Sequence, residues 1–391
     1  MRVLAVSTWL PTSSSPSTGS FVVRDARAIA DLGHDVALVH LVPPDQLGDD
    51  PEREVLAGLP VTRVPMSTTD PVQILRAGMT LRRLARGADL VHTMAFSTLL
   101  PMAWWRPAVP WVHTEHWSGL TAPQTLPSAW RRALPVLRPL LARPDMATAV
   151  CDYLARPVRE VRGERPTVVV PCIVPPLREV PERAAPVAGA PDTPAADAPD
   201  DTGHGTLRMV SVGGLIERKD PLLAVDTVAE LRRRGLRAQL RFVGEGPLRG
   251  AITQRAREQR VEDAVELVGT RDRAGVLEEL AAADLFLGPT RGDNFFVSCA
   301  EAVVAGRPVV VGSTGGQGEY LHPDIGVTVD EQTAPAYADA VQQVLRTAEG
   351  WSAEQIAATI GDDFSEESVA RGYQGAYDQA AAVRGRRGSG R

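Results

Sequence analysis

The sequence predicts an α/β protein with two doubly wound, Rossmann-like domains. Short apolar runs bounded by turn residues alternate with segments of helical periodicity, first from the N-terminus and again from residue 207. Between these stretches, residues 181–206 are rich in Pro, Ala and Asp and hold one large aliphatic residue, Val187. Such a segment buries too little apolar surface to offset its ordering entropy. We therefore expect a flexible linker there, between two domains.

The first domain begins with a strand, a loop, a helix and a second strand. Residues 3–6 and 36–39 are apolar runs typical of strands buried on both faces, and residues 21–32 carry apolar side chains near helical spacing before Gly33. This order is a βαβ unit, the building block of a parallel sheet. Further strands of this domain are expected at residues 61–64, 90–92, 111–114, 146–150 and 167–170.

The second domain repeats the pattern. A strand over residues 207–212 ends in Gly213-Gly214, and a helix over 221–231 leads to a strand over 240–243. Later strands are expected at residues 264–268, 285–287, 308–311 and 325–329. We predict a first domain over 1–180, the linker over 181–206, a second domain over 207–362, a helix over 363–384 that crosses back to the first domain, and a disordered tail over 385–391.

Composition excludes several classes of protein. The 391 residues are 44% hydrophobic and 23% charged, which is ordinary for a globular chain. A membrane-spanning helix is not expected, because no run of 18 apolar residues occurs. The net charge of −6 argues against a nucleic-acid partner. The N-terminal apolar run is too short for a signal peptide, so we expect a cytoplasmic protein.

Two acids and a helix start follow the strand at 285–287. Asp293 and Glu301 lie eight residues apart, and a polar loop between the strand and the acids opens the helix. Free backbone amides at a helix N-terminus suit an anion or a hydroxylated ligand. The amides in question belong to Asn294, Phe295, Phe296 and Val297. Without further context, an N-cap and one solvated acid explain the two carboxylates equally well.

Glycines and cations follow two other strands of the second domain. The turn at Gly213-Gly214 lets a phosphate approach the backbone, and Arg218 and Lys219 could neutralise a diphosphate. Glu245 sits in a Gly-rich turn after the strand at 240–243.

The first domain has its own candidates. Gly19 lies in a Ser/Pro-rich loop after the first strand, and His113 and His116 flank Glu115 at the end of the strand at 111–114. A metal site would need a third coherent ligand, so we expect none.

In combination these motifs resemble the family 4 retaining glycosyltransferases, which have the GT-B fold of two Rossmann-like domains facing a central cleft. The resemblance implies that Asp293 contacts the donor sugar and that Glu301 binds the ribose, although the family has Glu at the first position. Lys219 matches a family Lys that stabilises the leaving diphosphate. Gly214 stands where the family has Arg, and Arg218 is the candidate substitute. His116 matches a His close to the transferred sugar. The same resemblance implies that the first domain receives the acceptor and that the second binds the nucleotide sugar.

The resemblance implies a hexosyltransferase that moves a sugar from a nucleotide-diphosphate sugar to a hydroxyl acceptor and keeps the anomeric configuration. The pathway would be glycan, glycolipid or natural-product biosynthesis, with a small-molecule, glycan or lipid-linked acceptor. No cofactor or metal is expected. Catalytic roles fall to His116, Lys219, Arg218 and Asp293. Donor-binding roles fall to Gly19, Gly213, Gly214, Glu245, Asn294, Phe295, Phe296, Val297 and Glu301.

Other interpretations stay open. A nucleotide-sugar epimerase could have the same fold, and a non-catalytic sugar-nucleotide-binding protein could keep the site without turnover. A Rossmann dehydrogenase is disfavoured, because the loop over residues 7–20 lacks the Gly-x-Gly-x-x-Gly turn. The basic stretch from Trp130 to Arg143 is a candidate for peripheral membrane contact, although prolines interrupt it.

Overall fold

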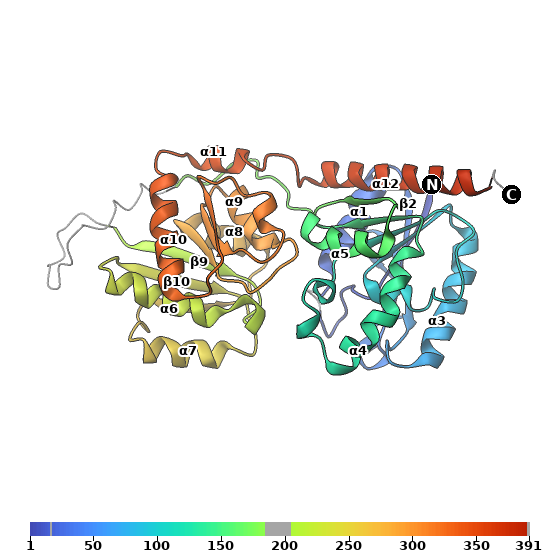
Figure 1. The fold of residues 1–391 in the computed structure, drawn as a ribbon, viewed down its shortest axis with the longest axis horizontal. Coiled ribbons are helices and arrows are strands. Elements are labelled where there is room, and N and C mark those ends of the chain that lie inside the picture. The colour runs from blue at the N-terminus through green and yellow to red at the C-terminus, as the bar shows by residue number, and fades with distance from the viewer. Residues whose placement is uncertain (16–17, 184–204, 389–391) are drawn as a thin grey trace. The chain divides into compact units, whose positions relative to one another are not determined.

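A computed structural model describes residues 1–15, 18–183 and 205–388. The chain divides into two compact units, each a wholly or mostly parallel β-sheet with covering helices (Figure 1). Unit 1 comprises Met1–Ile173 and Asp363–Arg391, and unit 2 comprises Val174–Asp362. The predicted class, two Rossmann-like α/β domains, is confirmed.

The sheet of unit 1 has eight strands in the order β3-β4-β2-β1-β5-β6-β7-β8. All pairs are parallel except β3 with β4. The strands are β1 (Arg2–Ser7), β2 (Asp35–Val42), β3 (Arg53–Leu56), β4 (Leu59–Pro65), β5 (Leu90–Met94), β6 (Trp111–Glu115), β7 (Met146–Ala149) and β8 (Thr167–Val169). The helices are α1 (Ser20–Asp31), α2 (Pro44–Leu47), α3 (Pro71–Leu84), α4 (Ser128–Leu137), α5 (Asp152–Arg162) and α12 (Glu366–Gly388). Strand β3 is the one that the sequence pattern missed, because it is a short, partly exposed edge strand without an apolar run.

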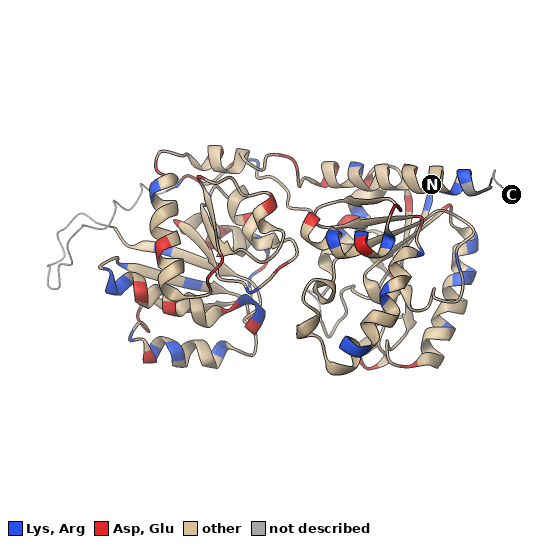
Figure 2. Cartoon of the chain, in the orientation of Figure 1, with Lys and Arg blue, Asp and Glu red and all other residues tan. Residues whose placement is uncertain are grey.

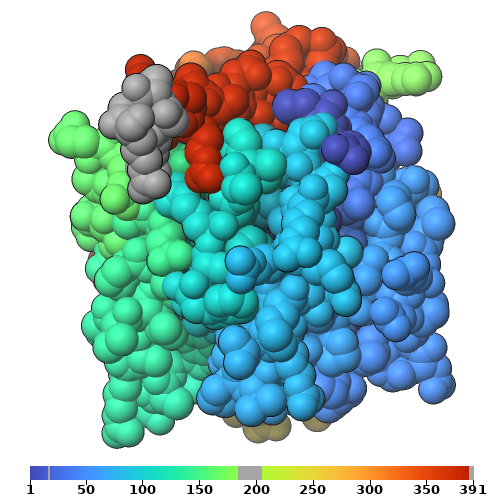
Figure 3. Space-filling model, turned by 90° about the vertical axis from the view of Figure 1, so that its right-hand side faces the viewer, coloured from blue at the N-terminus to red at the C-terminus, as the bar shows by residue number. Residues whose placement is uncertain are grey.

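The last helix of the chain, α12, packs onto unit 1, where it contacts α1, β6 and β7. Its red surface borders the blue and green surface of that unit in Figure 3. Its Tyr373 and Tyr377 are fully buried in the core of that unit. Tyr373 Oη donates a 2.9 Å hydrogen bond to Asp25 Oδ2, and Tyr377 Oη lies 2.9 Å from His92 Nδ1. The sequence predicted a disordered tail from residue 385, whereas helix α12 continues to Gly388. Residues 389–391 lie outside the described residues.

Substitution of Asp25 by Asn is expected to remove a pH-dependent loss of stability in unit 1. Burial raises the pKa of Asp25 from 3.8 to about 7, although the Tyr373 hydroxyl and the charge of Arg24 oppose the rise. The native state therefore holds this proton more tightly than the unfolded chain, and stability is lost as the pH rises from about 4 to about 7. As the pH rises from 5 to 8, the free energy of unfolding of Asp25→Asn should rise by about 2–4 kcal/mol relative to that of wild type.

Denaturant unfolding at both pH values measures this difference. Asp31→Asn is the matched control, since Asp31 lies on the same helix in an exposed ion pair with Arg27. Parallel pH profiles of wild type and Asp25→Asn would contradict the prediction.

The sheet of unit 2 has six parallel strands in the order β11-β10-β9-β12-β13-β14. The strands are β9 (Leu207–Val212), β10 (Ala238–Val243), β11 (Val265–Gly269), β12 (Leu285–Gly288), β13 (Val309–Gly312) and β14 (Gly326–Val329). The helices are α6 (Pro221–Arg233), α7 (Arg249–Glu258), α8 (Arg273–Ala282), α9 (Val297–Val304), α10 (Ala334–Thr347) and α11 (Ala353–Ala358). The chain leaves β9 toward β10, whereas β12 lies on the other side of β9. The carboxyl ends of β9 and β12 therefore flank a topological switch point, where open α/β sheets bind ligands.

The segment that leads out of unit 1 is held on unit 2 as far as residue 183. The fully buried guanidinium of Arg307 donates to the carbonyls of Pro181 and Glu182, and Arg183 donates to the carbonyl of Trp351. A buried cation needs such acceptors. Residues 181–183 thus belong to unit 2, while residues 184–204 of the predicted linker lie outside the described residues.

Surface charge is mixed in both units. Acidic and basic residues are interspersed along α5, α6 and α7 in Figure 2. Within the described part of the chain, no helix has the length and apolar character that crossing a bilayer requires.

Candidate functional site

A compact cluster of charged side chains lies at the switch point of unit 2. Arg218 and Lys219 come from the 3-10 turn that follows β9, and Asp293 comes from the loop after β12. Asp293 Oδ2 accepts hydrogen bonds from Lys219 Nζ at 2.6 Å and from Arg218 Nη1 at 2.7 Å. The sheet order thus joins residues 74 positions apart in the sequence.

The charges in this cluster are only partly compensated. Burial by itself would raise the pKa of Asp293, but Lys219 and Arg218 lower it to about 2, so the carboxylate is ionised. Burial lowers the pKa of Lys219, while Asp293 opposes that shift. Two cations share one carboxylate, and a positive charge is left over. A diphosphate is the kind of anion that such a site can neutralise.

Phe296 packs its ring against the cluster. Its ring lies 3.5 Å from Lys219 Nζ, measured to the ring centroid, in a cation–π contact. The backbone of Phe296 is left-handed (φ 59°) at the start of α9, a strained conformation for a bulky residue. Asp293 Oδ1 accepts from the Phe296 amide at 3.3 Å, which helps to hold that turn. The sequence placed Phe296 at a donor site but gave no sign of this ring contact.

The side chains of Phe295 and Phe296 are buried. Phe295 packs on Tyr320 with ring centroids 5.3 Å apart, and Tyr320 Oη donates to the carbonyls of both Phe residues. Ser298 Oγ donates to the Val212 carbonyl at 2.9 Å, which ties the first turn of α9 to the end of β9. The N-terminal amides of α9 therefore lie at the switch point.

Glycines let the strand ends approach one another closely. Gly244 (φ 142°) follows β10, and a Cβ atom there would lie 2.1 Å from the Gly213 carbonyl oxygen. At Gly214, in contrast, an added Cβ would have no neighbour nearer than 3.9 Å. Gly213, Gly214, Lys219 and Phe296 line one small hollow. The position where the family has Arg thus has room for a side chain.

The other predicted donor residues of unit 2 lie on, or next to, the strands and helices that border this hollow. Asn294 is buried in the loop before α9, and Val297 is the first residue of that helix. Glu301 is one turn further on, partly buried. Glu245 follows β10 and pairs with Arg249 at 2.9 Å on the surface. The ribose role of Glu301 and the donor role of Glu245 stay predictions.

Two predicted residues belong to unit 1. His116 follows β6, and its ring centroid lies 4.8 Å from that of Phe21. Burial, with a smaller effect from His113, lowers the pKa of His116 to about 3, so its imidazole is neutral near pH 7. Gly19 (φ 69°) begins α1 where a Cβ would lie 2.1 Å from the Trp9 carbonyl oxygen, which indicates a packing role. Its donor-binding role stays a prediction.

Metal ligands do not gather in the described ranges: no group of three or more His, Cys, Asp or Glu residues there could hold an ion. The expected metal independence stays a prediction.

Lys219 has a further distinction in the sequence. It is the only lysine among the 391 residues, in a chain that otherwise uses Arg for its basic side chains. An ammonium group is a compact point charge, whereas a guanidinium is a planar fork. The single lysine of the chain thus lies in the charged cluster.

A two-domain α/β fold whose switch point carries two cations and closely packed glycines suits the binding of a phosphorylated ligand. Residues 206–347 match the family model described as glycosyl transferases group 1, and residues 18–178 match glycosyltransferase family 4. The chain belongs to the family 4 glycosyltransferases, as the sequence motifs predicted.

Relatives and solved structures agree with this family. The chain is 30% identical over 186 residues to glycogen synthase of Mycobacterium tuberculosis, covering 47% of this chain and 44% of that protein. It is 30% identical over 138 residues to a GDP-mannose-dependent phosphatidylinositol dimannoside mannosyltransferase of the same species, covering 35% of each. The matches thus span less than half the length of these curated relatives.

The solved structures share the fold over nearly the full length of the sequence. Sucrose-phosphate synthase from Thermosynechococcus elongatus superposes with a TM-score of 0.74 at 20% identity, covering 98% of this chain and 100% of that one. HepE from Anabaena, solved with UDP and glucose, superposes with a TM-score of 0.67 at 15% identity, covering 96% and 98%. The predicted GT-B fold is confirmed.

Proposed function

We propose that this protein is a hexosyltransferase that moves a sugar from a nucleotide-diphosphate sugar to a hydroxyl acceptor with retention of configuration. The observation that carries the proposal is the Arg218–Lys219–Asp293 cluster at the switch point of unit 2. Family membership and the similarity to glycogen synthase and to a GDP-mannose-dependent enzyme support it.

The cluster can stabilise the leaving group. As the bond between the anomeric carbon and the phosphate oxygen breaks, negative charge grows on the diphosphate. Lys219 and Arg218 are already held in place by Asp293, so they stabilise that charge without reorganising. We assign Asp293 chiefly to positioning the two cations, because its Oδ2 already accepts from both. Direct contact of Asp293 with the donor sugar stays a prediction from the family.

For retention, we propose attack from the face that the diphosphate leaves. The acceptor oxygen bonds to the anomeric carbon, its proton passes to the departing phosphate oxygen, and the nucleoside diphosphate is released. Neutral His116 would hydrogen-bond to the sugar as a positioning group and would not act as a cationic acid. The cytoplasmic location and the membrane contact at Trp130–Arg143 stay predictions.

Labelling of the single lysine tests the diphosphate site. An amine-reactive acetylating reagent should modify Lys219 and the N-terminal amine, which peptide mass spectrometry resolves. UDP, GDP or ADP at ten times its dissociation constant should slow acetylation of Lys219 by about tenfold, because only the free protein reacts. The N-terminal amine is the internal control and should react at the same rate throughout. Equal labelling of Lys219 with and without all three nucleotides would contradict the proposal.

A turnover assay then separates the candidate activities. Release of nucleoside diphosphate that depends on a hydroxyl acceptor supports transfer. Conversion of the nucleotide sugar to an epimer without release would identify an epimerase, and protection without any conversion would identify a binding protein.

A further inference from the structure

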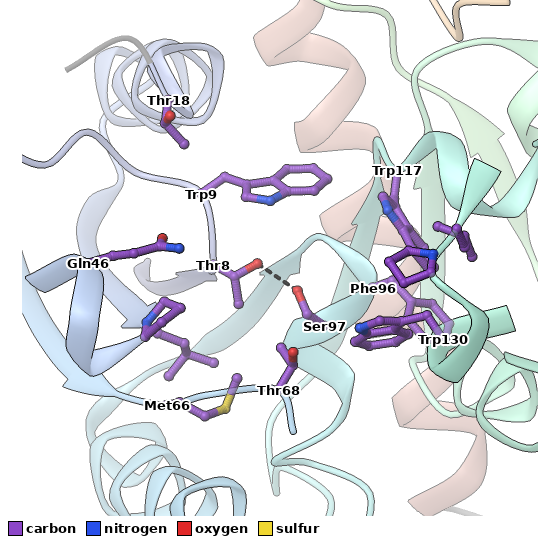
Figure 4. Close-up of a pocket in the computed structure, with 14 residues that line it drawn as sticks. Thr8, Trp9, Thr18, Gln46, Met66, Thr68, Phe96, Ser97, Trp117 and Trp130 are labelled. Carbon is purple, nitrogen blue, oxygen red and sulfur yellow. Dashed lines mark hydrogen bonds between the residues drawn. The ribbon is translucent and has the colours of Figure 1, made fainter. Parts of the chain in front are cut away.

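A cavity in unit 1 has a volume of about 500 Å³ and lies at the carboxyl ends of the central strands of its sheet. Its lining comes from the segments that follow β1, β2, β4, β5 and β6, together with the start of α4 (Figure 4). In an open parallel sheet, this edge is the one that binds ligands. The volume is in the range of pockets that enclose a small organic molecule.

Aromatic rings form one side of this cavity. The ring centroids of Phe96 and Trp117 are 5.4 Å apart with the planes inclined by 29°, and those of Trp117 and Trp130 are 5.6 Å apart with the planes inclined by 69°. Trp9 lies across from these three rings (Figure 4). Such an arrangement offers flat apolar faces to a ring-shaped ligand.

The backbone beside this wall is strained. Ala95, fully buried at the end of β5, has φ 96°, a conformation that residues with a Cβ atom rarely adopt. It turns the chain so that Phe96 and Ser97 reach the cavity. Strain of this kind persists at functional sites because the surrounding structure enforces it.

The polar part of the lining is neutral. The polar side chains are Thr8, Thr18, Gln46, Thr68 and Ser97, and the other nine of the fourteen lining residues are apolar. Thr8 Oγ1 and Ser97 Oγ are 2.6 Å apart and hydrogen-bond to each other. None of the fourteen is Asp, Glu, Lys, Arg or His. A few hydroxyl groups can therefore be recognised here, but a charge would lose its hydration without a partner.

We propose that this cavity binds the acceptor, and that the acceptor is an uncharged molecule with a flat apolar ring system that bears a hydroxyl group. The proposal rests on the proposed glycosyl transfer. Between ring centroids, Trp9 is 6.0 Å from Phe21, and Phe21 is 4.8 Å from His116. One aromatic residue, Phe21, therefore links the cavity to the candidate sugar-positioning residue.

Two other acceptor chemistries fit the lining less well. A phosphorylated acceptor would need a cation, and the lining has none. An oligosaccharide carries hydroxyl groups around each ring, and the apolar majority of the lining would leave many of them without partners.

Calorimetric titration of the whole chain without any nucleotide sugar tests the ligand class. The probes are 2-naphthol, 2-naphthyl phosphate and maltotriose. We expect 2-naphthol to bind at least about tenfold more tightly than the other two, because a buried phosphate or unpaired hydroxyls each cost more than about 1.4 kcal/mol. Tighter or equal binding of maltotriose or of 2-naphthyl phosphate would overturn the proposal.

Variants locate the binding. Trp130→Ala should weaken 2-naphthol binding by about tenfold, and Trp104→Ala, an exposed tryptophan of the same unit outside the lining, should leave it unchanged. Gln46 is exposed at the rim, so Gln46→Lys should fold normally and should favour 2-naphthyl phosphate over 2-naphthol. Equal effects of Trp130→Ala and Trp104→Ala would place the naphthol elsewhere and overturn the proposal.

The two proposals fail separately. If Lys219 is protected by nucleotides and acceptor-dependent release occurs, but 2-naphthol does not bind, the acceptor inference alone is wrong. If 2-naphthol binds as expected and no nucleotide protects Lys219, the proposed transfer is wrong, while the cavity remains a site for a neutral ring-shaped ligand.

Discussion

Substitution of Lys219 by Met is expected to lower kcat/KM for the nucleotide sugar by about 100- to 1,000-fold. Removal of one preorganised group that stabilises developing negative charge costs about 2.7–4 kcal/mol of transition-state stabilisation. Met keeps the length and the packing on Phe296 but loses the ammonium group that now sits 3.5 Å from that ring. Asp293 keeps its ion pair with Arg218, so the loop is still anchored.

The effect is measured as nucleoside diphosphate release, with the far-ultraviolet spectrum and melting temperature as checks on folding. Arg255→Met is the matched control, since Arg255 forms an ion pair with Asp226 on helices away from the cluster. A surface pair of that kind is worth about 1 kcal/mol or less, and it touches no part of the site. If the rate for Lys219→Met were within threefold of that for Arg255→Met, the lysine would not stabilise the leaving group.

Substitution of Gly244 by Ala is expected to destabilise unit 2 by about 2–4 kcal/mol. The added Cβ would lie 2.1 Å from the Gly213 carbonyl oxygen, closer than any real contact, and the φ of 142° is unfavourable for a residue with a side chain. The Gly244 amide also donates to the Gly269 carbonyl at 2.9 Å, so the chain cannot move aside without losing that bond. The strand ends that carry the glycine-lined hollow would have to separate.

Calorimetric melting resolves this loss, because the transition of unit 2 should shift while that of unit 1 stays in place. Gly214→Ala is the control: it adds the same methyl group in the adjoining turn, with no neighbour nearer than 3.9 Å. We expect the free energy of unfolding of that variant to stay within about 0.5 kcal/mol of wild type, as it does for most substitutions at exposed positions. If both variants behaved alike, the close approach of the two turns would not exist in solution.

Much of the site could be predicted because its residues follow strands directly. Gly213, Lys219 and Asp293 each come within a few residues after an apolar run, and parallel strands place such residues at one edge of the sheet. The sequence could not show that Asp293 would hold both cations. That contact depends on the adjacency of β9 and β12, which follows from the order of the whole sheet.

Other features left no local signal at all. The strain at Ala95 and the left-handed backbone of Phe296 occur at residue types that rarely adopt such conformations, so no pattern indicates them. The cavity of unit 1 collects residues from five strand ends, and single tryptophans in the sequence look the same whether they fill a core or line a pocket.

The sequence by itself determined the α/β class, most strand positions and the candidate cations, because apolar periodicity and turn residues act over a few neighbouring positions. Only the tertiary structure decided that β9 and β12 adjoin, that Tyr373 and Tyr377 of α12 enter the core of unit 1, and that Trp9 faces Phe96 and Trp130 across one cavity. These arrangements depend on contacts between segments far apart in the chain. Long-range pairing is selected by the packing of the complete core, which no local stretch of sequence encodes.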